Sequence, residues 1–220
     1  NPDTYFQSRE ATNPWYDAVY EHVETAMNDF AAATGRQYKP FEFYGHPQAE
    51  RVIVIMGSAI GTCEEVVDEL LSRGEKVGVL KVRLHRPFSA AHLLDVLPES
   101  ARAVAVLDRT KEPGALAEPL YLDVMTALAE AFNRGERETL PRTIGGRYGL
   151  SSKEFGPECV LAIFNELSAA KPKPRFTVGI YDDVTNLSLP LVENTLPSEA
   201  KLEALFYGLG SDGSVSATKN

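Results

Sequence analysis

The chain has 220 residues, 44% hydrophobic and 24% charged, a balance typical of one or two folded domains rather than a disordered chain. With 31 acidic and 22 basic residues it carries a net charge of −9, which argues against a nucleic acid or an anionic membrane as partner. The longest apolar run, Val52 to Met56, has the length of a strand and is too short for a membrane helix.

The two cysteines, Cys63 and Cys159, are too few for a disulfide framework or for a four-thiolate metal site. Their scarcity suits a reducing compartment, so we expect a cytoplasmic location. The chain begins at Asn1 without a methionine and stops directly after a glycine-rich turn. We therefore expect it to be part of a longer polypeptide.

Helices and strands are predicted to alternate along the chain. Apolar residues recur at helical spacing between Ala18 and Phe30, Thr34-Gly35 ends that helix, and residues 38–43 form an extended lead-in. Short apolar runs then predict strands at 51–57, 77–84, 103–107 and 142–150. The helices between and after them are expected to begin near Thr62 and Ser89, which can cap them, and to span 116–132 and 157–167, with Ser151 capping the region before the last.

Alternation at this spacing predicts an α/β fold with a parallel or mixed sheet. The breaker Lys171-Pro-Lys-Pro174 marks a boundary. Beyond it we expect a strand at 176–181, a polar arm at 182–190, and the incomplete start of a second α/β domain with a strand at 204–207.

The sharpest motif is GLGSDG at 208–213, which fits G-x-G-x-x-G after a predicted strand. Glycines let a phosphate approach the backbone closely. A nicotinamide site also needs a following helix, a second strand and an acid about 20 residues on, and only seven residues remain. The pattern favours an anion-binding loop for a phosphate-bearing ligand, with an ordinary tight turn as the alternative.

Other polar groups follow predicted strands, where open α/β sheets bind ligands. The turn from Gly57 to Thr62 lacks the lysine of a P-loop, and we interpret it as a compact strand-to-helix connection, or alternatively as a phosphate or subunit contact. Asp108 near Arg83 is a candidate acid or anchor. The alternative is that the charges at these strand ends pair with one another or with a neighbouring domain; they are Arg83, His85, Arg86, Asp108, Arg109, Lys111 and Glu112.

Two glycines before Arg147 and Tyr148 indicate a tight turn that presents them, more typical of a domain junction than of a ligand site. Cys63 is placed in the first turn of a helix, which can lower a thiol pKa, although a thiol without a partner histidine is commonly inert. The four histidines lack metal-ligand spacing. The sequence also lacks a complete thiamine diphosphate magnesium motif and a clustered cysteine run.

Taken together, these segments resemble an internal stretch of the pyruvate:ferredoxin (flavodoxin) oxidoreductases, the thiamine-dependent 2-oxoacid oxidoreductases. The resemblance is carried, in family order, by segments that include GGRYGLSSKEFGP at 145–157, FTVGIYDDVTNLSLP at 176–190 and FYGLGSDGSVSATKN at 206–220, together with residues 1–17, 38–58, 82–89, 104–114 and 118–124.

The resemblance implies a division into four parts. Residues 1–40 would be the helical exit from an upstream thiamine-pyrimidine domain, 41–170 a three-layer α/β domain like the transketolase C-terminal domain, 171–195 a linker or arm, and 196–220 the truncated start of a gamma-type coenzyme A-binding domain. The coenzyme A loop of the family matches GLGSDGSV, which gives that role to Gly210, Ser211, Asp212, Gly213, Ser214 and Val215. Ser216 stands where the family is expected to have glycine.

For the intact enzyme the resemblance implies oxidative decarboxylation of pyruvate with coenzyme A to acetyl-CoA and CO₂, with electrons passed to ferredoxin or flavodoxin. Thiamine diphosphate, Mg²⁺ and 4Fe-4S clusters would be held outside this chain, which by itself would be inactive, and the intact enzyme would be a homodimer. No catalytic or metal-ligating residue is assigned to this chain. The alternative is a stand-alone, non-catalytic α/β module for subunit association or regulation.

Overall fold

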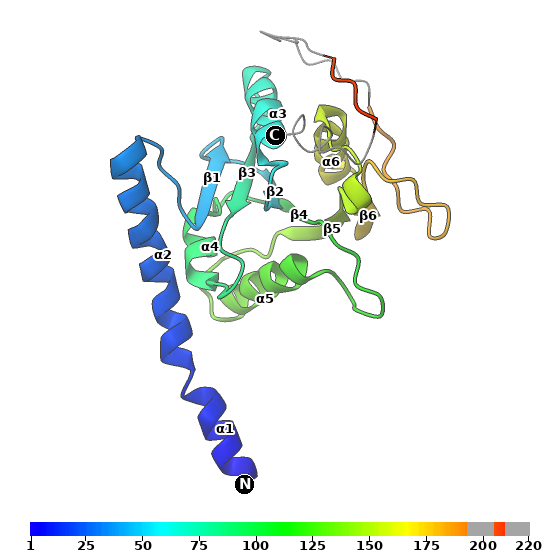
Figure 1. Cartoon of the computed structure of the whole chain (residues 1–220). Coiled ribbons are helices and arrows are strands. Elements are labelled where there is room, and N and C mark those ends of the chain that lie inside the picture. Colours follow the sequence, from blue (N-terminus) through cyan, green and yellow to red (C-terminus); the bar gives the residue numbers. More distant parts are fainter. Residues whose placement is uncertain (193–204, 210–220) are drawn as a thin grey trace.

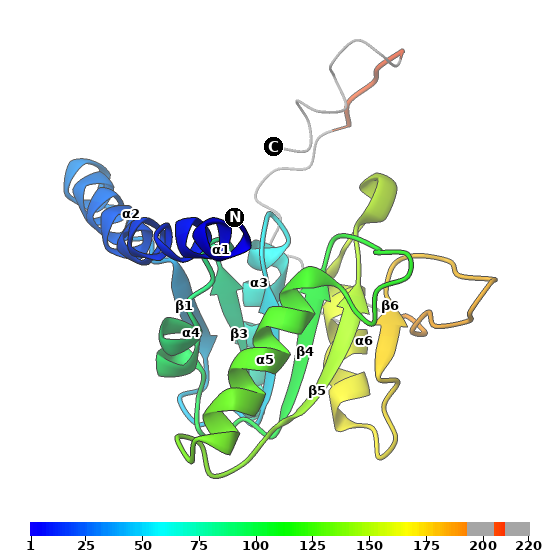
Figure 2. The ribbon, with the colours of Figure 1, turned by 90° about the horizontal axis from the view of Figure 1, so that it is seen from below.

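The computed structural model describes residues 1–192 and 205–209. Its core is a six-stranded mixed sheet between two layers of helices (Figures 1 and 2). The strand order is β1-β3-β2-β4-β5-β6. The strands are β1 (Phe41–Gly45), β2 (Arg51–Ile55), β3 (Val77–Val82), β4 (Ala103–Asp108), β5 (Arg142–Arg147) and β6 (Arg175–Thr177).

Four helices cover the sheet and two form an N-terminal arm. The arm consists of α1 (Pro2–Glu10) and α2 (Asn13–Thr34), and Figure 1 shows it running away from the body of the molecule. The covering helices are α3 (Ile60–Ser72), α4 (Ala90–Val96), α5 (Pro119–Asn133) and α6 (Pro157–Ser168). None of the helices in the two described ranges is long and apolar enough to cross a membrane.

The central strands are mostly apolar because both faces of the sheet are covered. Every residue of β3 and β4 is buried. One face packs against α3 and α6 through residues such as Val66 and Phe164. The other face packs against α4 and α5 through residues such as Leu93 and Leu128. The result is the three-layer α/β architecture that the alternation of elements predicts.

The edge of the sheet at β1 depends on a pair of glycines. β1 runs antiparallel to β3, and Gly45 lies opposite Gly78. A Cβ on Gly45 would lie 2.4 Å from the Cα of Gly78, and Gly45 has φ 139°, a backbone conformation that favours glycine. Residues 38–43, predicted only as an extended lead-in, therefore contribute an edge strand because two glycines let the chains approach closely.

The helix predicted from Ala18 is confirmed but begins earlier, at Asn13, and the four predicted strands after it are confirmed. Three of these strands are shorter than predicted, and β4 extends one residue further, to Asp108. Ser89 caps α4 by accepting from the backbone N–H of His92, as expected. The predicted cap at Thr62 is wrong: α3 begins two residues earlier at Ile60, because the turn at Gly57 (φ 91°) leads directly into the helix.

Three further expectations need correction. Ser151 lies in a short 3-10 turn with φ 54°, and Gly156 is the cap residue of α6. The sheet continues past the boundary expected near Lys171, because β6 pairs in parallel with β5. The strand expected at 204–207 is absent from its described part, residues 205–207, which are exposed and extended away from the sheet. The division of the chain into four parts stays a prediction.

A buried lysine ties β1, β3 and α3 together. The ammonium group of Lys81, 3% exposed, contacts the carboxylate of Glu42 and lies 2.8 Å from that of Glu64. Arg83 pairs with the other oxygen of Glu42 at 2.7 Å. Burial by itself raises the pKa of Glu42, but the hydrogen bonds from Lys81 and Arg83 outweigh it and hold the pKa below 4.5.

The lowered pKa of Glu42 predicts a pH-dependent contribution to stability. The contribution is complete above pH 4.5, the ordinary pKa, and is lost as the pH falls below that value through the pKa of the folded state. We expect Glu42→Gln to lower the free energy of unfolding by about 1–2 kcal/mol at pH 7. The difference from the parent chain should shrink towards zero at pH 3 in urea unfolding followed by circular dichroism.

Glu50→Gln is the matched control, because the pair between Glu50 and Lys76 is about half exposed and 3.3 Å long. It should change the unfolding free energy by less than about 0.5 kcal/mol at any pH. A Glu42→Gln difference that stayed constant from pH 7 to pH 3 would contradict the assignment.

Candidate functional site

The carboxyl ends of the parallel strands gather most of the polar residues that the sequence singles out. Parallel strands end at the same edge of a sheet, which is where open α/β folds bind ligands. β3 ends before Arg83, β4 ends at Asp108, and β5 ends at Arg147. The neighbouring turn Gly57–Thr62 follows β2. The contacts of each group decide which of them is free to act on a ligand.

Asp108 is a structural anchor and not a catalytic acid. Its side chain is 2% exposed and accepts hydrogen bonds from the backbone N–H groups of Leu120 at 2.9 Å and Tyr121 at 3.1 Å. These are among the unpaired N–H groups at the start of α5. Burial raises the pKa of the carboxyl group. The expected approach of Asp108 to Arg83 is wrong, because α5, and not β3, supplies its partners.

The same contacts explain why α5 begins later than predicted. The helix was expected from Leu116, but Leu116 is 92% exposed and the helix begins at Pro119. Proline fits the first turn because its missing N–H would be unpaired there. Asp108 then holds the next two N–H groups and fixes where α5 meets the sheet.

Arg147 forms a buried ion pair with Glu118. Its Nε lies 2.6 Å from the Glu118 carboxylate, and the two side chains are 12% and 2% exposed. Glu118 directly precedes α5, so the pair joins the end of β5 to the start of that helix. The sequence analysis did not predict Glu118 as a partner of Arg147, because the two residues are 29 apart and meet only through the order of the strands.

The cationic groups after β3 are also satisfied within the domain. Arg83 pairs with Glu42, and both His85 and Arg86 contact the carboxylate of Asp123, at 3.0 Å and 2.5 Å. After β4, Lys111 donates to the carbonyl of Glu112. The expectation that these charges pair with one another or with a neighbouring domain is therefore wrong for the group after β3, because their partners are Glu42 and Asp123 of the same domain.

One hollow of about 310 Å³ opens at this edge, beside the turn before α3. Two of its lining side chains are held by hydrogen bonds. The Tyr148 hydroxyl donates to the carbonyl of Met56 at 2.7 Å, and the Nε of Arg109 donates to the carbonyl of Gly149. The residues that line it are Ser58, Ala59, Thr62, Arg109, Tyr148, Gly149, Ser152, Lys153, Glu154 and Phe155.

The lining of this hollow suits an anion or a partner surface better than catalysis. It combines two cationic residues, one acidic residue, four hydroxyls and the first turn of α3. The hydroxyls have no histidine among the lining residues to activate them. The sequence analysis did not single out Ser152 and Lys153, because only the fold of the segment after β5 brings them beside the Gly57–Thr62 turn.

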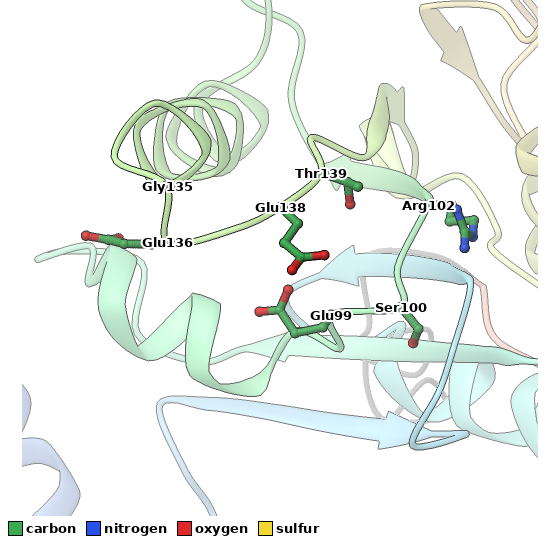
Figure 3. Close-up of a pocket in the computed structure, with 7 residues that line it drawn as sticks. All are labelled: Glu99, Ser100, Arg102, Gly135, Glu136, Glu138 and Thr139. Atoms are coloured by element: carbon green, nitrogen blue, oxygen red, sulfur yellow. The ribbon is translucent and has the colours of Figure 1, made fainter.

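A second hollow, of about 600 Å³, lies below the sheet near the amino ends of β4 and β5. Figure 3 shows the carboxylates of Glu99 and Glu138 facing one another across it, with Glu136 further out. The remaining lining residues are Ser100, Arg102, Gly135 and Thr139. Within residues 1–192 and 205–209 these carboxylates do not form a group that could hold a metal ion.

Both cysteines are buried and free. Burial raises the pKa of the Cys63 thiol and that of Cys159. The expectation that the helix start lowers the Cys63 pKa is wrong, because the thiol faces the apolar core between α3 and the sheet. It fits the alternative interpretation of an inert structural thiol.

The predicted coenzyme A loop lies outside the described residues. This applies to each of its six members, Gly210, Ser211, Asp212, Gly213, Ser214 and Val215. The residues just before it, 205–209, are largely exposed. The role of the loop therefore stays a prediction from the sequence.

Comparison with known proteins identifies relatives along the whole chain. Residues 49–149 match the family model for pyruvate:ferredoxin oxidoreductase core domain II. The chain is 88% identical over 220 residues to a probable pyruvate-flavodoxin oxidoreductase of Escherichia coli K12 and covers 19% of that protein. It is 55% identical over 221 residues to a pyruvate:ferredoxin oxidoreductase of Moorella thermoacetica, covering 18% of it. In each case the match covers 100% of this chain.

Among solved structures, a 2-oxoglutarate:ferredoxin oxidoreductase from Magnetococcus marinus, with 2-oxoglutarate, coenzyme A and succinyl-CoA bound, aligns with 60% of this chain and 20% of its own. The identity is 22% and the TM-score 0.39. The chain spans about a fifth of the length of the curated relatives that it matches.

The buried pair of Arg147 and Glu118 predicts an asymmetric mutational effect. We expect Arg147→Met to lower the free energy of unfolding by about 3–5 kcal/mol, because it leaves the Glu118 carboxylate buried without a partner. Adding Glu118→Gln should restore most of the loss. Urea unfolding of the single and double variants measures both.

Arg134→Met is the control, because Arg134 pairs with Glu130 and Glu136 on the exposed surface. It should leave the free energy of unfolding close to that of the parent chain, because solvent screens exposed ion pairs. If the double variant at 147 and 118 were less stable than Arg147→Met alone, the buried carboxylate would not be the source of the loss.

Proposed function

We propose that the chain belongs to the pyruvate:ferredoxin oxidoreductase family and forms one part of an enzyme that oxidatively decarboxylates pyruvate. In the reaction, pyruvate and coenzyme A give acetyl-CoA, CO₂, a proton and two electrons. The carboxylate carbon leaves as CO₂, the thiol sulfur bonds to the acyl carbon, and the electrons pass to ferredoxin or flavodoxin. The observation that carries the proposal is 88% identity along the entire chain to a pyruvate-flavodoxin oxidoreductase.

The cofactors of the reaction are assigned to parts of the polypeptide beyond this chain. A 4Fe-4S cluster takes four thiolates, whereas the two cysteines here are buried in the apolar core. Thiamine diphosphate, with Mg²⁺, supplies the carbanion chemistry when it is bound. In the described residues, the carboxylates at the carboxyl edge of the sheet accept hydrogen bonds from the first turn of α5 or pair with His85 and Arg147. These contacts are structural.

Within the proposal, this chain supplies a scaffold and one lip of a coenzyme A site. The lip is the loop Gly210, Ser211, Asp212, Gly213, Ser214 and Val215 at the start of a gamma-type domain, for which the support is the sequence motif. Backbone N–H groups in a glycine-rich loop suit the phosphates of coenzyme A. One loop does not enclose such a ligand, so the rest of the pocket comes from elsewhere.

The proposal includes the assembly and location expected from the sequence. Residues 1–40 leave an upstream thiamine-pyrimidine domain, 41–170 form the α/β domain, 171–195 connect it onward, and 196–220 open the next domain. The complete enzyme works as a homodimer in the cytoplasm, which suits the two free thiols. The alternative, a stand-alone regulatory module, does not account for the 88% identity to an enzyme about five times as long.

The activity is tested with the full-length polypeptide that carries this chain, loaded with thiamine diphosphate, Mg²⁺ and iron–sulfur clusters under anaerobic conditions. We expect reduction of flavodoxin or ferredoxin that requires both pyruvate and coenzyme A, with acetyl-CoA formed in proportion. The isolated 220-residue chain should show none. Pyruvate-independent reduction, or turnover by the isolated chain, would refute the proposal.

The coenzyme A loop makes a separate prediction in the same enzyme. We expect Gly213→Val to raise the KM for coenzyme A about ten-fold or more, because a side chain blocks the approach of a phosphate to the backbone. The KM for pyruvate should not change, since the loop is assigned to coenzyme A alone. The measurement is steady-state kinetics with each substrate varied in turn.

Gly114→Val is the control, because Gly114 (φ 80°) lies in an open loop where valine strains the backbone, but no atom lies within 4 Å of an added Cβ and no ligand is assigned there. It should leave both KM values within two-fold of those of the parent enzyme, a difference of about 0.4 kcal/mol or less in binding free energy. A folded Gly213→Val enzyme with an unchanged KM for coenzyme A would remove the loop from the site.

A further inference from the structure

The N-terminal arm carries the largest group of exposed aromatic side chains in the described residues. Tyr5 and Phe6 on α1 are 69% and 64% exposed, and Trp15 and Tyr16 on α2 are 78% and 60% exposed. Neither α1 nor α2 buries any residue. Figures 1 and 2 show α1 nearly continuing the line of α2 beyond the body of the molecule.

These four residues lie on one broad side of a nearly continuous helix. Ala11 and Thr12, between α1 and α2, keep right-handed helical dihedral angles. The N–H of Ala11 donates to the carbonyl of Gln7 at 2.9 Å, as in a helix. Eleven residues make about three turns, so Tyr16 returns to the side of Tyr5, with Phe6 and Trp15 flanking it. We call this set the aromatic arm surface.

The aromatic arm surface continues a stripe by which α2 already packs on its own domain. Tyr20, one turn after Tyr16, stacks on the ring of His92 in α4 with centroids 3.5 Å apart. Val23 and Met27, further along the same stripe, are half-buried. Tyr5 lies 15 residues before Tyr20, roughly 22 Å along a helix. The stripe therefore runs past the edge of the body with the same apolar character.

We propose that the aromatic arm surface docks on another folded domain of the same, longer polypeptide. Neither α1 nor the start of α2 buries a residue against the body, so their exposed aromatic side chains are left for a partner to cover. Buried aromatic side chains contribute about 150–250 Å² each, and four that are two-thirds exposed leave roughly 400–700 Å² to cover. A second domain provides that cover.

The area decides between a partner in the same polypeptide and a second copy of the chain. Counting both sides, roughly 800–1,400 Å² would be buried, within the range of interfaces between domains of one chain. It reaches only the lower end of the range for stable association of separate proteins. Covalent connection supplies a millimolar effective concentration, at which a small interface suffices. The curated relatives, about five times as long as this chain, have the length to supply the domain.

The test replaces Tyr16 with the photo-crosslinking residue p-benzoylphenylalanine in the full-length polypeptide. After irradiation we expect a cross-link within one polypeptide, which leaves its mass on a denaturing gel unchanged. Peptide mapping should join the segment around Tyr16 to sequence outside residues 1–220. The control places the same residue at Gln7, two helical positions after Tyr5 and on the opposite side, where the cross-linked yield should be at least five-fold lower.

Each other outcome overturns the proposal. A product of doubled mass would identify a second copy as the partner. A cross-link to residues inside 1–220, or a yield no greater than at Gln7, would mean that no further domain covers this surface. The proposal rests only on the longer-polypeptide part of the proposed function, and cross-linking is read without turnover. An inactive enzyme that still cross-links as expected would refute the activity and leave the docking intact.

Discussion

The carboxyl edge of the sheet is held together by buried charges that find their partners inside the same domain. Asp108 at the end of β4 accepts from the first free N–H groups of α5, and Arg147 at the end of β5 pairs with Glu118 just before that helix. A buried charge without a partner costs several kcal/mol, so these contacts fix α5 against β4 and β5.

The same constraint occupies the titratable groups at this edge with structural contacts. Groups that would serve as acid or base are used as hydrogen-bond acceptors, as Asp108 and Asp123 show. The thiols of Cys63 and Cys159 face the core, where burial disfavours the thiolate. These contacts agree with the proposed role of the chain as a scaffold within a longer enzyme, of which its match covers about a fifth.

The two ends of the described chain differ from the body in the same respect. The arm exposes Tyr5, Phe6, Trp15 and Tyr16, and the segment 205–209 exposes Leu205, Phe206, Tyr207 and Leu209. Both segments therefore present apolar side chains that the body of the domain does not cover. For the arm, the stripe from Tyr20 to Tyr5 also indicates which side of the helix is the proposed docking surface.

Local patterns in the sequence were enough to predict the alternation of strands and helices, the cap at Ser89 and the resemblance to the oxidoreductase family. Apolar runs bounded by glycine and helical spacing are local patterns, and local patterns survive without knowledge of the fold. The tertiary structure alone decided that Arg147 meets Glu118, that Lys81 meets Glu42 across 39 residues, and that β1 and β6 form the edges. Charges pair through space, and strand order, which local periodicity does not encode, sets which of them come within reach.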